Sequence, residues 1–165
     1  MHTQSGESLI EIILVLFLVS LAISGLMGTM LKAQQLSHGS IQQSSAAQVL
    51  SSFAHDPRSN RVDTRHHLNR YLVSLNAHSA VAVGCSTGSE CSGAAWANQH
   101  IYMLHRRLVQ TLPEFELIIC RDITPFDGEN LADPACDGLD FRTLTAKLWW
   151  SNRGVEQQLA LQLGL

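Results

Sequence analysis

The first part of the chain is an unbroken run of apolar residues. No residue from Ile12 to Leu31 carries a charge. At about 1.5 Å of rise per helical residue, such a run spans roughly 30 Å, the thickness of the hydrocarbon core of a bilayer. The run is apolar on every side, whereas a helix on the surface of a soluble protein has one polar face. The pattern therefore predicts a helix that crosses a membrane.

The helical pattern continues beyond this run. Residues 32–53 contain no proline, and apolar residues recur there at helical spacing, namely Ala46, Val49 or Leu50, and Phe53. Asp56-Pro57 ends the pattern, because a residue that precedes proline is disfavoured in the helical conformation. We therefore expect one helix from about residue 8 to residue 54, apolar all round in its first half and amphipathic in its second.

Two shorter segments also have a helical pattern. Over Thr64–Leu75, apolar residues fall at positions i, i+3, i+4 and i+7, namely Leu68, Tyr71, Leu72 and Leu75. A third helix is expected over Ala94–Leu112, where one face carries Ala97, Ile101, Leu104 and Leu108. Pro113 marks its end.

After Pro113 the apolar residues recur with a period of two, which is typical of β-strands. Three strands are expected, over Phe115–Cys120, Leu144–Trp150 and Leu159–Leu163, with a turn at Ser151–Gly154 between the last two. An antiparallel sheet of this size can bury one face against the long helix.

Because Trp149 and Trp150 are adjacent in a predicted strand, their side chains lie on opposite faces of the sheet. We expect Trp150 in the core and Trp149 exposed, for contact with another chain.

The distribution of charged residues also separates the apolar N-terminal part from the rest of the chain. The protein has 165 residues, with 11 Lys and Arg and 14 Asp and Glu, but only Glu7 and Glu11 are charged between Met1 and Leu31. The net charge is −3, and the longest basic cluster is Arg106-Arg107. Nucleic-acid binding requires a concentrated basic face, so the composition excludes that class of partner.

The chain contains four cysteines, Cys85, Cys91, Cys120 and Cys136. No pair has the CxxC spacing of a structural zinc site or a thioredoxin-like motif. An even number of cysteines beside an export segment favours disulfides and an oxidising compartment. Four cysteines allow three pairings, of which we favour the two local ones, Cys85–Cys91 and Cys120–Cys136. The second would close a loop of about 17 residues and stabilise the fold by about 3 kcal/mol.

The sequence does not favour an enzyme. His100 and His105 are five positions apart and do not share a helical face as i, i+4 metal ligands do, and His66-His67 stands in no HExxH frame. Four aspartates of the loop 121–142 lack the spacing of a calcium loop and are expected to be solvated, namely Asp127, Asp133, Asp137 and Asp140. We expect no catalytic residues, no cofactor, no metal site and no small-molecule substrate.

The N-terminal register resembles the class III signal of type IV pilins and pseudopilins. A short leader ends at Gly6, a glutamate stands at the fifth position after it, Glu11, and the apolar run follows. The resemblance implies that prepilin peptidase cuts between Gly6 and Glu7 and N-methylates Glu7. It also implies that Glu11 pairs with the N-terminal amine of a neighbouring subunit. A carboxylate beside lipid is costly and is usually kept because something pairs with it.

The rest of the chain resembles the minor pilins of the type IV pilus modification protein PilV family. The residues that carry the resemblance are Cys85 and Cys91 before Trp96, Leu112-Pro113, Cys120-Arg121-Asp122, Ala135-Cys136-Asp137-Gly138 and Leu148-Trp149-Trp150. The resemblance implies an α+β, pilin-like fold, in which a long N-terminal helix packs against a small antiparallel sheet with disulfide-closed loops. It divides the chain into a leader (1–6), a transmembrane and assembly half-helix (7–31), an amphipathic half-helix (32–55) and a periplasmic head (56–165).

The resemblance further implies a minor pilin that primes assembly of the type IV pilus and enters it in a tip complex. Its partners would be other minor pilins, the major pilin, prepilin peptidase and the inner membrane. The chain would be a single-pass inner-membrane protein before assembly and part of the pilus at the cell surface afterwards, with roles in adhesion and twitching motility. Three alternatives remain open: a type II secretion minor pseudopilin, a single-span envelope protein with a small binding head, and a secretory signal peptide cut after Ala22 that leaves a soluble domain starting at Ile23.

Overall fold

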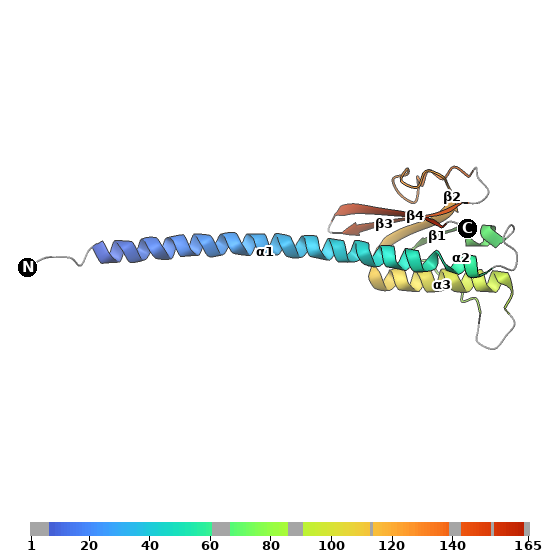
Figure 1. The fold of residues 1–165 in the computed structure, drawn as a ribbon, viewed down its shortest axis with the longest axis horizontal. Coiled ribbons are helices and arrows are strands. Elements are labelled where there is room, and N and C mark those ends of the chain that lie inside the picture. The colour runs from blue at the N-terminus through green and yellow to red at the C-terminus, as the bar shows by residue number, and fades with distance from the viewer. Residues whose placement is uncertain are drawn as a thin grey trace, which may run out of the picture. The chain divides into compact units, whose positions relative to one another are not determined.

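The computed structural model describes residues 7–60, 67–85, 91–112, 114–138, 143–152 and 154–163. The chain forms two compact units, Met1–Ile41 and Gln42–Leu165. One helix, α1 (Glu7–Phe53), runs from the first unit into the second, and its 47 residues confirm the long helix predicted from the sequence (Figure 1).

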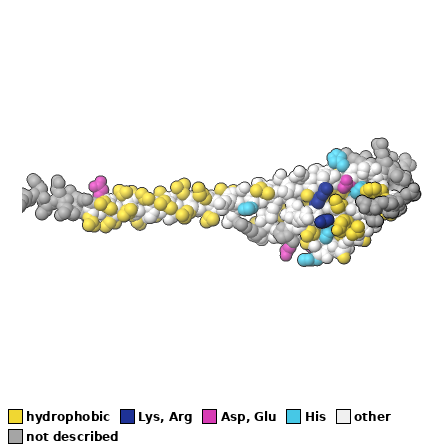
Figure 2. Space-filling view, turned by 90° about the horizontal axis from the view of Figure 1, so that it is seen from below, with side chains coloured by type: hydrophobic (Ala, Val, Ile, Leu, Met, Phe, Trp, Pro, Cys, Tyr) yellow, Lys and Arg dark blue, Asp and Glu magenta, His cyan; other side chains and the backbone are white. Residues whose placement is uncertain are grey.

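In the first unit, α1 exposes apolar side chains on all sides. The large hydrophobic residues between Leu9 and Leu31 are 48% to 67% exposed. Figure 2 shows these side chains along the visible face of the helix. By length and composition, α1 could span a membrane, and it is the one helix of the described residues that meets this test. The structure thus contains the long apolar N-terminal helix that the sequence predicts.

The second unit consists of a layer of helices on one face of a sheet (Figure 1). The helical layer contains the end of α1, the short helix α2 (Asp56–Ser59), the 3-10 helix η2 (His67–Tyr71) and α3 (Gly93–Thr111). Ser92 caps α3, because its hydroxyl accepts a hydrogen bond from the Ala95 N–H. The bounds of α3 and its buried face agree with the prediction from the sequence.

The sheet has four antiparallel strands in the order β1-β2-β3-β4. They are β1 (Val73–Asn76), β2 (Phe115–Arg121), β3 (Leu144–Asn152) and β4 (Val155–Leu163). Leu117 of β2 lies opposite Leu148 of β3, so apolar residues line up across one face. We call this face, which packs on the helices, the inner face.

The core lies between the inner face and the helices. From α1 it takes Ala46, Leu50 and Phe53, as predicted, and from α3 it takes Ala97, Ile101, Leu104 and Leu108. The strands contribute residues of alternating position, namely Leu75, Phe115, Leu117, Ile119, Leu144, Ala146, Leu148, Trp150 and Leu163. The burial of these side chains is the main favourable contribution to the stability of the unit.

The structure corrects the prediction of a helix over Thr64–Leu75 and of a sheet with three strands. Residues 61–66 lie outside the described part, but His67–Tyr71 form only a short 3-10 helix and Val73–Asn76 form strand β1. Val73 pairs with Ile119 of β2. A period of 3.6 over one short segment is overridden here by hydrogen bonds to a neighbouring strand, which the local sequence does not reveal.

The structure also corrects the prediction that Trp149 is exposed. Trp150 lies in the core as expected, but Trp149, on the outer face of the sheet, is only 7% exposed. The segment 122–138, drawn in orange in Figure 1, lies on the side of the sheet away from the helices. Because this segment covers the outer face, the residues of β3 from Leu144 to Trp150 are buried on both faces.

Two disulfides connect the cysteines. Cys85 bonds to Cys91 and Cys120 to Cys136, which are the two local pairings favoured by the sequence. The second ties the covering segment to the end of β2. Within that segment Gly128 has φ +94°, and a Cβ atom at this position would lie 2.5 Å from the Pro134 carbonyl oxygen, so the close turn requires glycine.

Candidate functional site

The first candidate site is the beginning of α1, where the resemblance to type IV pilins implies an assembly carboxylate, Glu11. Gly6 lies outside the described residues, and Glu7 is the first residue of α1. Glu11 is exposed in the second turn, and no other charged residue follows on the helix until Lys32. Its neighbours Ile10 and Ile12 expose 67% and 58% of their surface. Glu11 is therefore a single exposed carboxylate near the start of a helix whose surface is otherwise apolar.

The polar groups within the apolar part of α1 are satisfied inside the helix. The hydroxyl of Ser20 donates to the Phe17 carbonyl at 2.8 Å, and that of Ser24 donates to the Ser20 carbonyl at 2.8 Å. Thr29 donates to the Leu26 carbonyl at 2.9 Å. A hydroxyl bonded in this way needs no water, so these residues are compatible with a lipid environment.

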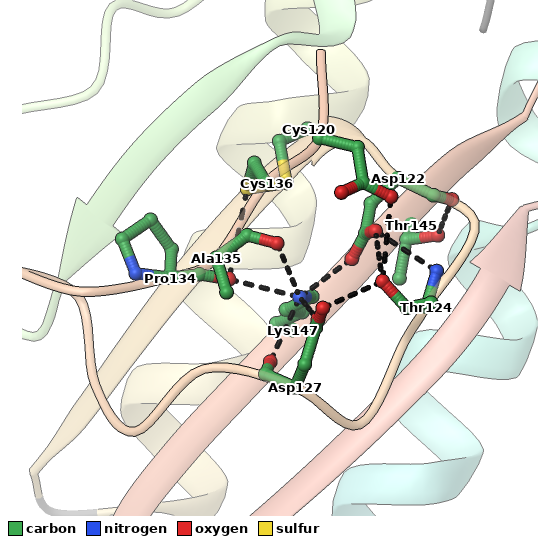
Figure 3. The surroundings of a disulfide bond; sticks show 10 residues. Cys120, Asp122, Thr124, Asp127, Pro134, Ala135, Cys136, Thr145 and Lys147 are labelled. Carbon is green, nitrogen blue, oxygen red and sulfur yellow. Dashed lines mark hydrogen bonds and ion pairs between the residues drawn. A yellow bond between two sulfur atoms is a disulfide. The ribbon is translucent and has the colours of Figure 1, made fainter. Parts of the chain in front are cut away.

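The second candidate site is a buried ion cluster between the outer face of the sheet and the covering segment. Figure 3 shows the Nζ atom of Lys147 surrounded by oxygen atoms from that segment. We call the group the Lys147 cluster, and its members are Asp122, Thr124, Asp127, Thr145 and Lys147. The side chains of Lys147 and Asp122 are completely buried, and that of Asp127 is 43% exposed.

Five oxygen atoms contact the Lys147 ammonium. Nζ lies 2.5 Å from Asp122 Oδ2 and 2.6 Å from Asp127 Oδ1. It also donates to the backbone carbonyls of Asp127 at 2.9 Å, Pro134 at 2.8 Å and Ala135 at 3.4 Å. A buried charge is tolerated only when it is paired and hydrogen-bonded, and this ammonium meets both conditions.

The carboxylates of the cluster are themselves held in place. Asp122 Oδ1 accepts hydrogen bonds from the backbone N–H of Thr124 at 2.9 Å and from its hydroxyl at 3.1 Å. Asp127 Oδ2 lies 2.6 Å from the same hydroxyl. The hydroxyl of Thr145, on β3, donates to the Asp122 carbonyl at 2.8 Å. The network therefore joins β3 to the covering segment at several points.

The cluster shifts the pKa values of its members. Burial alone would raise the pKa of Asp122, but hydrogen bonds from Lys147 and Thr124 outweigh burial and hold it below the ordinary value. The Lys147 hydrogen bond also lowers the pKa of Asp127. Burial disfavours the charged form of Lys147, yet the two carboxylates raise its pKa. All three groups are therefore charged at neutral pH.

The same arrangement bears on metal binding. Oxygen atoms of Asp122, Asp127 and Asp137 lie within 4.8 Å of one another, close enough for a metal ion, and they are the one such group among the described residues. The Lys147 ammonium contacts two of these three carboxylates. The cluster thus carries its own cation. An amine kept protonated by two carboxylates is a poor nucleophile, so the geometry supports a structural role.

The sequence analysis did not single out Lys147, and it named Asp122 only as part of the Cys120-Arg121-Asp122 element, with no role as an ion-pair partner. The available signal was a lysine in the middle of the otherwise uncharged strand Leu144–Trp150. Asp127, Asp133 and Asp137 are all exposed, as expected of loop aspartates, but the ion pair of Asp127 with Lys147 is a contact that the sequence did not predict. Asp140 lies outside the described residues. The local spacing of the aspartates could not reveal a partner on a later strand.

The two histidines of α3 have different hydrogen-bond partners. His100 Nδ1 lies 3.0 Å from the Tyr71 hydroxyl, whereas His105 Nε2 lies 3.0 Å from the Asn76 carbonyl oxygen. Burial lowers the pKa of His100. His66 lies outside the described part of the chain. Each of the two α3 histidines contacts a different neighbour and contributes to packing of the head.

Comparisons with the models of known protein families, with curated proteins and with solved structures find no match to this chain.

The contacts of the Lys147 cluster predict that removal of its one positive charge strongly lowers the stability of the second unit. In Lys147→Met, two carboxylates lose their cation, and we expect the free energy of unfolding of the head to fall by about 3 to 5 kcal/mol. Chemical denaturation of the full chain in detergent, followed by tryptophan fluorescence, measures the change. The double variant Lys147→Met/Asp122→Asn, which also removes the buried negative charge, should recover part of the loss. Unchanged stability of Lys147→Met would contradict the interpretation.

The lowered pKa values of Asp122 and Asp127 predict acid sensitivity. The unfolded chain binds protons at these carboxyls more readily than the folded chain does, so their contribution is present above the usual aspartate pKa of about 4. It is lost as the pH falls through the lowered folded values. Denaturation midpoints measured between about pH 6 and pH 2 should fall less steeply for Lys147→Met than for the parent. If the denaturation midpoints of both proteins changed with pH in parallel, the cluster would not be the source of the acid sensitivity.

Proposed function

We propose that this chain is a minor pilin of the type IV pilus modification protein PilV type, which primes pilus assembly and enters the fibre in a tip complex. The observation that carries the proposal is the first part of α1. There, apolar side chains are exposed on every side, and Glu11 is the single charge between Ser8 and Leu31. Such a surface needs a partner that is apolar all round, either lipid or other helices of the same kind.

Assembly in this proposal is a transfer between two apolar surroundings. The helix is stored in the inner membrane and then moves into a bundle of subunit helices in the pilus core. Because lipid and a bundle of such helices have similar polarity, the transfer gains little from the hydrophobic effect. Helix packing and the pairing of polar groups must then drive it, and this makes the single carboxylate important.

Glu11 is the group that would provide this pairing. After cleavage behind Gly6, the N-terminal amine of Glu7 would carry a positive charge in its protonated form. The carboxylate of Glu11 in one subunit would neutralise the amine of the next, so that neither charge stays unpaired among apolar helices. Its position near the start of the helix also complements the helix dipole. The proposed activity is ordered association rather than catalysis.

The head supports the proposal in two ways. Its two disulfides are typical of proteins in an oxidising compartment, which favours a periplasmic head before assembly and a place at the cell surface afterwards. The combination of a helical layer with a small antiparallel sheet agrees with the α+β layout that the resemblance implies. The partners would be other minor pilins, the major pilin and prepilin peptidase.

Three alternatives share part of this description. A type II secretion minor pseudopilin would use the same helix and register, and the Cys-Arg-Asp element at Cys120 and the tryptophan pair favour the pilus protein. A single-span envelope protein would keep the helix uncut. A secretory signal peptide would remove it as far as Ala22.

The mature N-terminus distinguishes these processing routes. We expect the intact mass of the protein from the native membrane to show removal of Met1–Gly6 only, because prepilin peptidase cuts after that glycine. An additional mass equal to one methyl group would indicate N-methylation of Glu7. Gly6→Leu should leave the leader attached. A mature chain that starts at Ile23, or an uncut chain in cells with the peptidase, would overturn the proposal.

Replacement of Glu11 tests the assembly step separately. In Glu11→Ala we expect normal cleavage and normal membrane insertion, but a strong decrease of this subunit in sheared pili and of piliation. The matched control is Ser20→Ala on the same helix, which removes a hydroxyl that is bonded only to the Phe17 carbonyl. It should assemble normally. Full piliation and full incorporation of Glu11→Ala would refute the pairing role.

A further inference from the structure

The two edges of the sheet differ in how far their backbone groups are satisfied. At one edge, β1 has only four residues, and both backbone groups of Asn76 are engaged. The Asn76 N–H donates to the Ser79 hydroxyl at 2.8 Å, and the Asn76 carbonyl oxygen lies 3.0 Å from His105 Nε2. At the other edge, β4 has nine residues. An edge strand presents backbone donors and acceptors with which another strand can pair, so β4 offers the longer row.

The register of the sheet shows which residues of β4 direct their backbone groups outward. Backbone groups of successive residues in a strand point to opposite sides. The Ala77 N–H donates to the Phe115 carbonyl at 3.2 Å, so the even-numbered residues of β2, such as Ile118, face β3. Ile118 pairs with Lys147, whose backbone groups thus face β2, and Lys147 pairs on its other side with Ala160. The residues of β4 that face outward therefore include Gln158, Ala160 and Gln162.

These three residues form a row of unpaired backbone groups. Within the described part of the chain, no hydrogen bond joins the backbone N–H or C=O of Gln158, Ala160 or Gln162 to another residue. The sequence of β4 also contains no proline or lysine, the residues that often prevent pairing at a natural sheet edge. The row fits an extended backbone, which carries the same groups at the same spacing.

Exposed apolar side chains border the same edge. The side-chain amide of Gln162 donates to the Ile123 carbonyl at 3.5 Å, and that of Gln158 donates to the Gly128 carbonyl at 3.3 Å. Residues 123–128 therefore run along the outer face of β4. Among them, Ile123 and Phe126 are 58% and 71% exposed. On the inner face, β4 carries two partly buried leucines, Leu159 and Leu161. A strand added beside β4 would thus have apolar neighbours on both faces.

The charges around this edge favour a partner other than a second copy of the chain. β4 and segment 122–138 contain no Lys or Arg, and their acidic residues are Asp122, Asp127, Glu129, Asp133, Asp137 and Glu156. Two copies joined at this edge would bring acidic side chains together, which is unfavourable. A partner with basic side chains would be complementary. A helix would not pair with the row, because its backbone groups are bonded internally.

We propose that the outer edge of β4 binds an extended segment of a partner protein, which adds a fifth strand to the sheet. The segment has apolar residues at alternate positions, one set of which packs against Ile123 and Phe126, and basic residues near its ends. Backbone hydrogen bonds to Gln158, Ala160 and Gln162 hold it in place. The proposal does not depend on the pilin role, since it concerns recognition by the second unit alone.

The test uses the full chain in neutral detergent and the peptide acetyl-Lys-Val-Thr-Val-Thr-Val-Lys-amide. We expect saturable heat in calorimetry, with a dissociation constant on the order of millimolar because a short peptide loses much conformational freedom on binding. The peptide should also slow hydrogen exchange at the amides of Gln158, Ala160 and Gln162, measured by NMR. The same peptide with every backbone nitrogen methylated has no donors and should not bind. No saturable heat, or equal binding of the methylated peptide, would overturn the proposal.

Proline variants at the two edges of the sheet separate pairing with β4 from unspecific attraction. Ala160→Pro removes an outward N–H but no hydrogen bond to β3, and proline is tolerated at such a position of an edge strand. It should weaken binding about tenfold or more. Ser74→Pro is the matched control, because Ser74 pairs with Ile118, which faces β3, so that its own N–H points outward from β1. It should bind as the parent does. An equal loss in Ser74→Pro would refute the site.

A third variant tests the apolar border without changing a strand. Phe126→Ser removes an exposed side chain and should weaken binding about tenfold. Thermal denaturation verifies that each variant is folded. Unchanged binding of both Ala160→Pro and Phe126→Ser would contradict the proposal. Sedimentation of the parent provides a further check, since a dimer that Ala160→Pro dissociates would assign the edge to a second copy and overturn the proposed partner.

Discussion

The ion pairs of the buried Lys147 ammonium hold segment 122–138 on the outer face of the sheet. Lys147 projects from β3 and contacts two carboxylates and three carbonyls of segment 122–138. Segment 122–138 contains no helix or strand that could hold it to the sheet by backbone ladders. It is attached instead by this cation, by the Thr145 hydroxyl, by the hydrogen bond from the Leu131 N–H to Glu116 of β2 and by the Cys120–Cys136 disulfide.

That attachment has consequences for the rest of the sheet. Because segment 122–138 covers the outer face, β3 becomes a central strand buried on both faces, and Trp149 lies in the interior. Segment 122–138 also places Glu129 at the end of the sheet, where it lines a cavity together with glutamates of β2 and β4. Segment 122–138 therefore contributes both to the ion pairs of Lys147 near the middle of β3 and to an acidic cavity at the end of the same strand.

The two compact units have opposite physical requirements. In Gln42–Leu165, a cluster of buried apolar residues forms a core between the sheet and the helices. In Met1–Ile41, the described apolar residues are exposed and the hydroxyls are bonded to carbonyls of their own helix. A single helix, α1, belongs to both units, and its sequence changes from apolar all round to amphipathic along its length.

Features that depend on local periodicity could be predicted from the sequence. These are the long helix α1, the buried face of α3, the strands β2 to β4 and the local pairing of the cysteines, since a helical or alternating pattern and short loop closure are properties of neighbouring residues. Strand β1, the burial of Trp149 and the Lys147–Asp122 pair depend on tertiary contacts and could not be predicted. Val73 is in a strand because it pairs with Ile119 of β2. Lys147 is paired with two aspartates of a loop that precedes its own strand in the sequence. No local pattern records such long-range contacts, because they exist only once the sheet has formed and its outer face is covered.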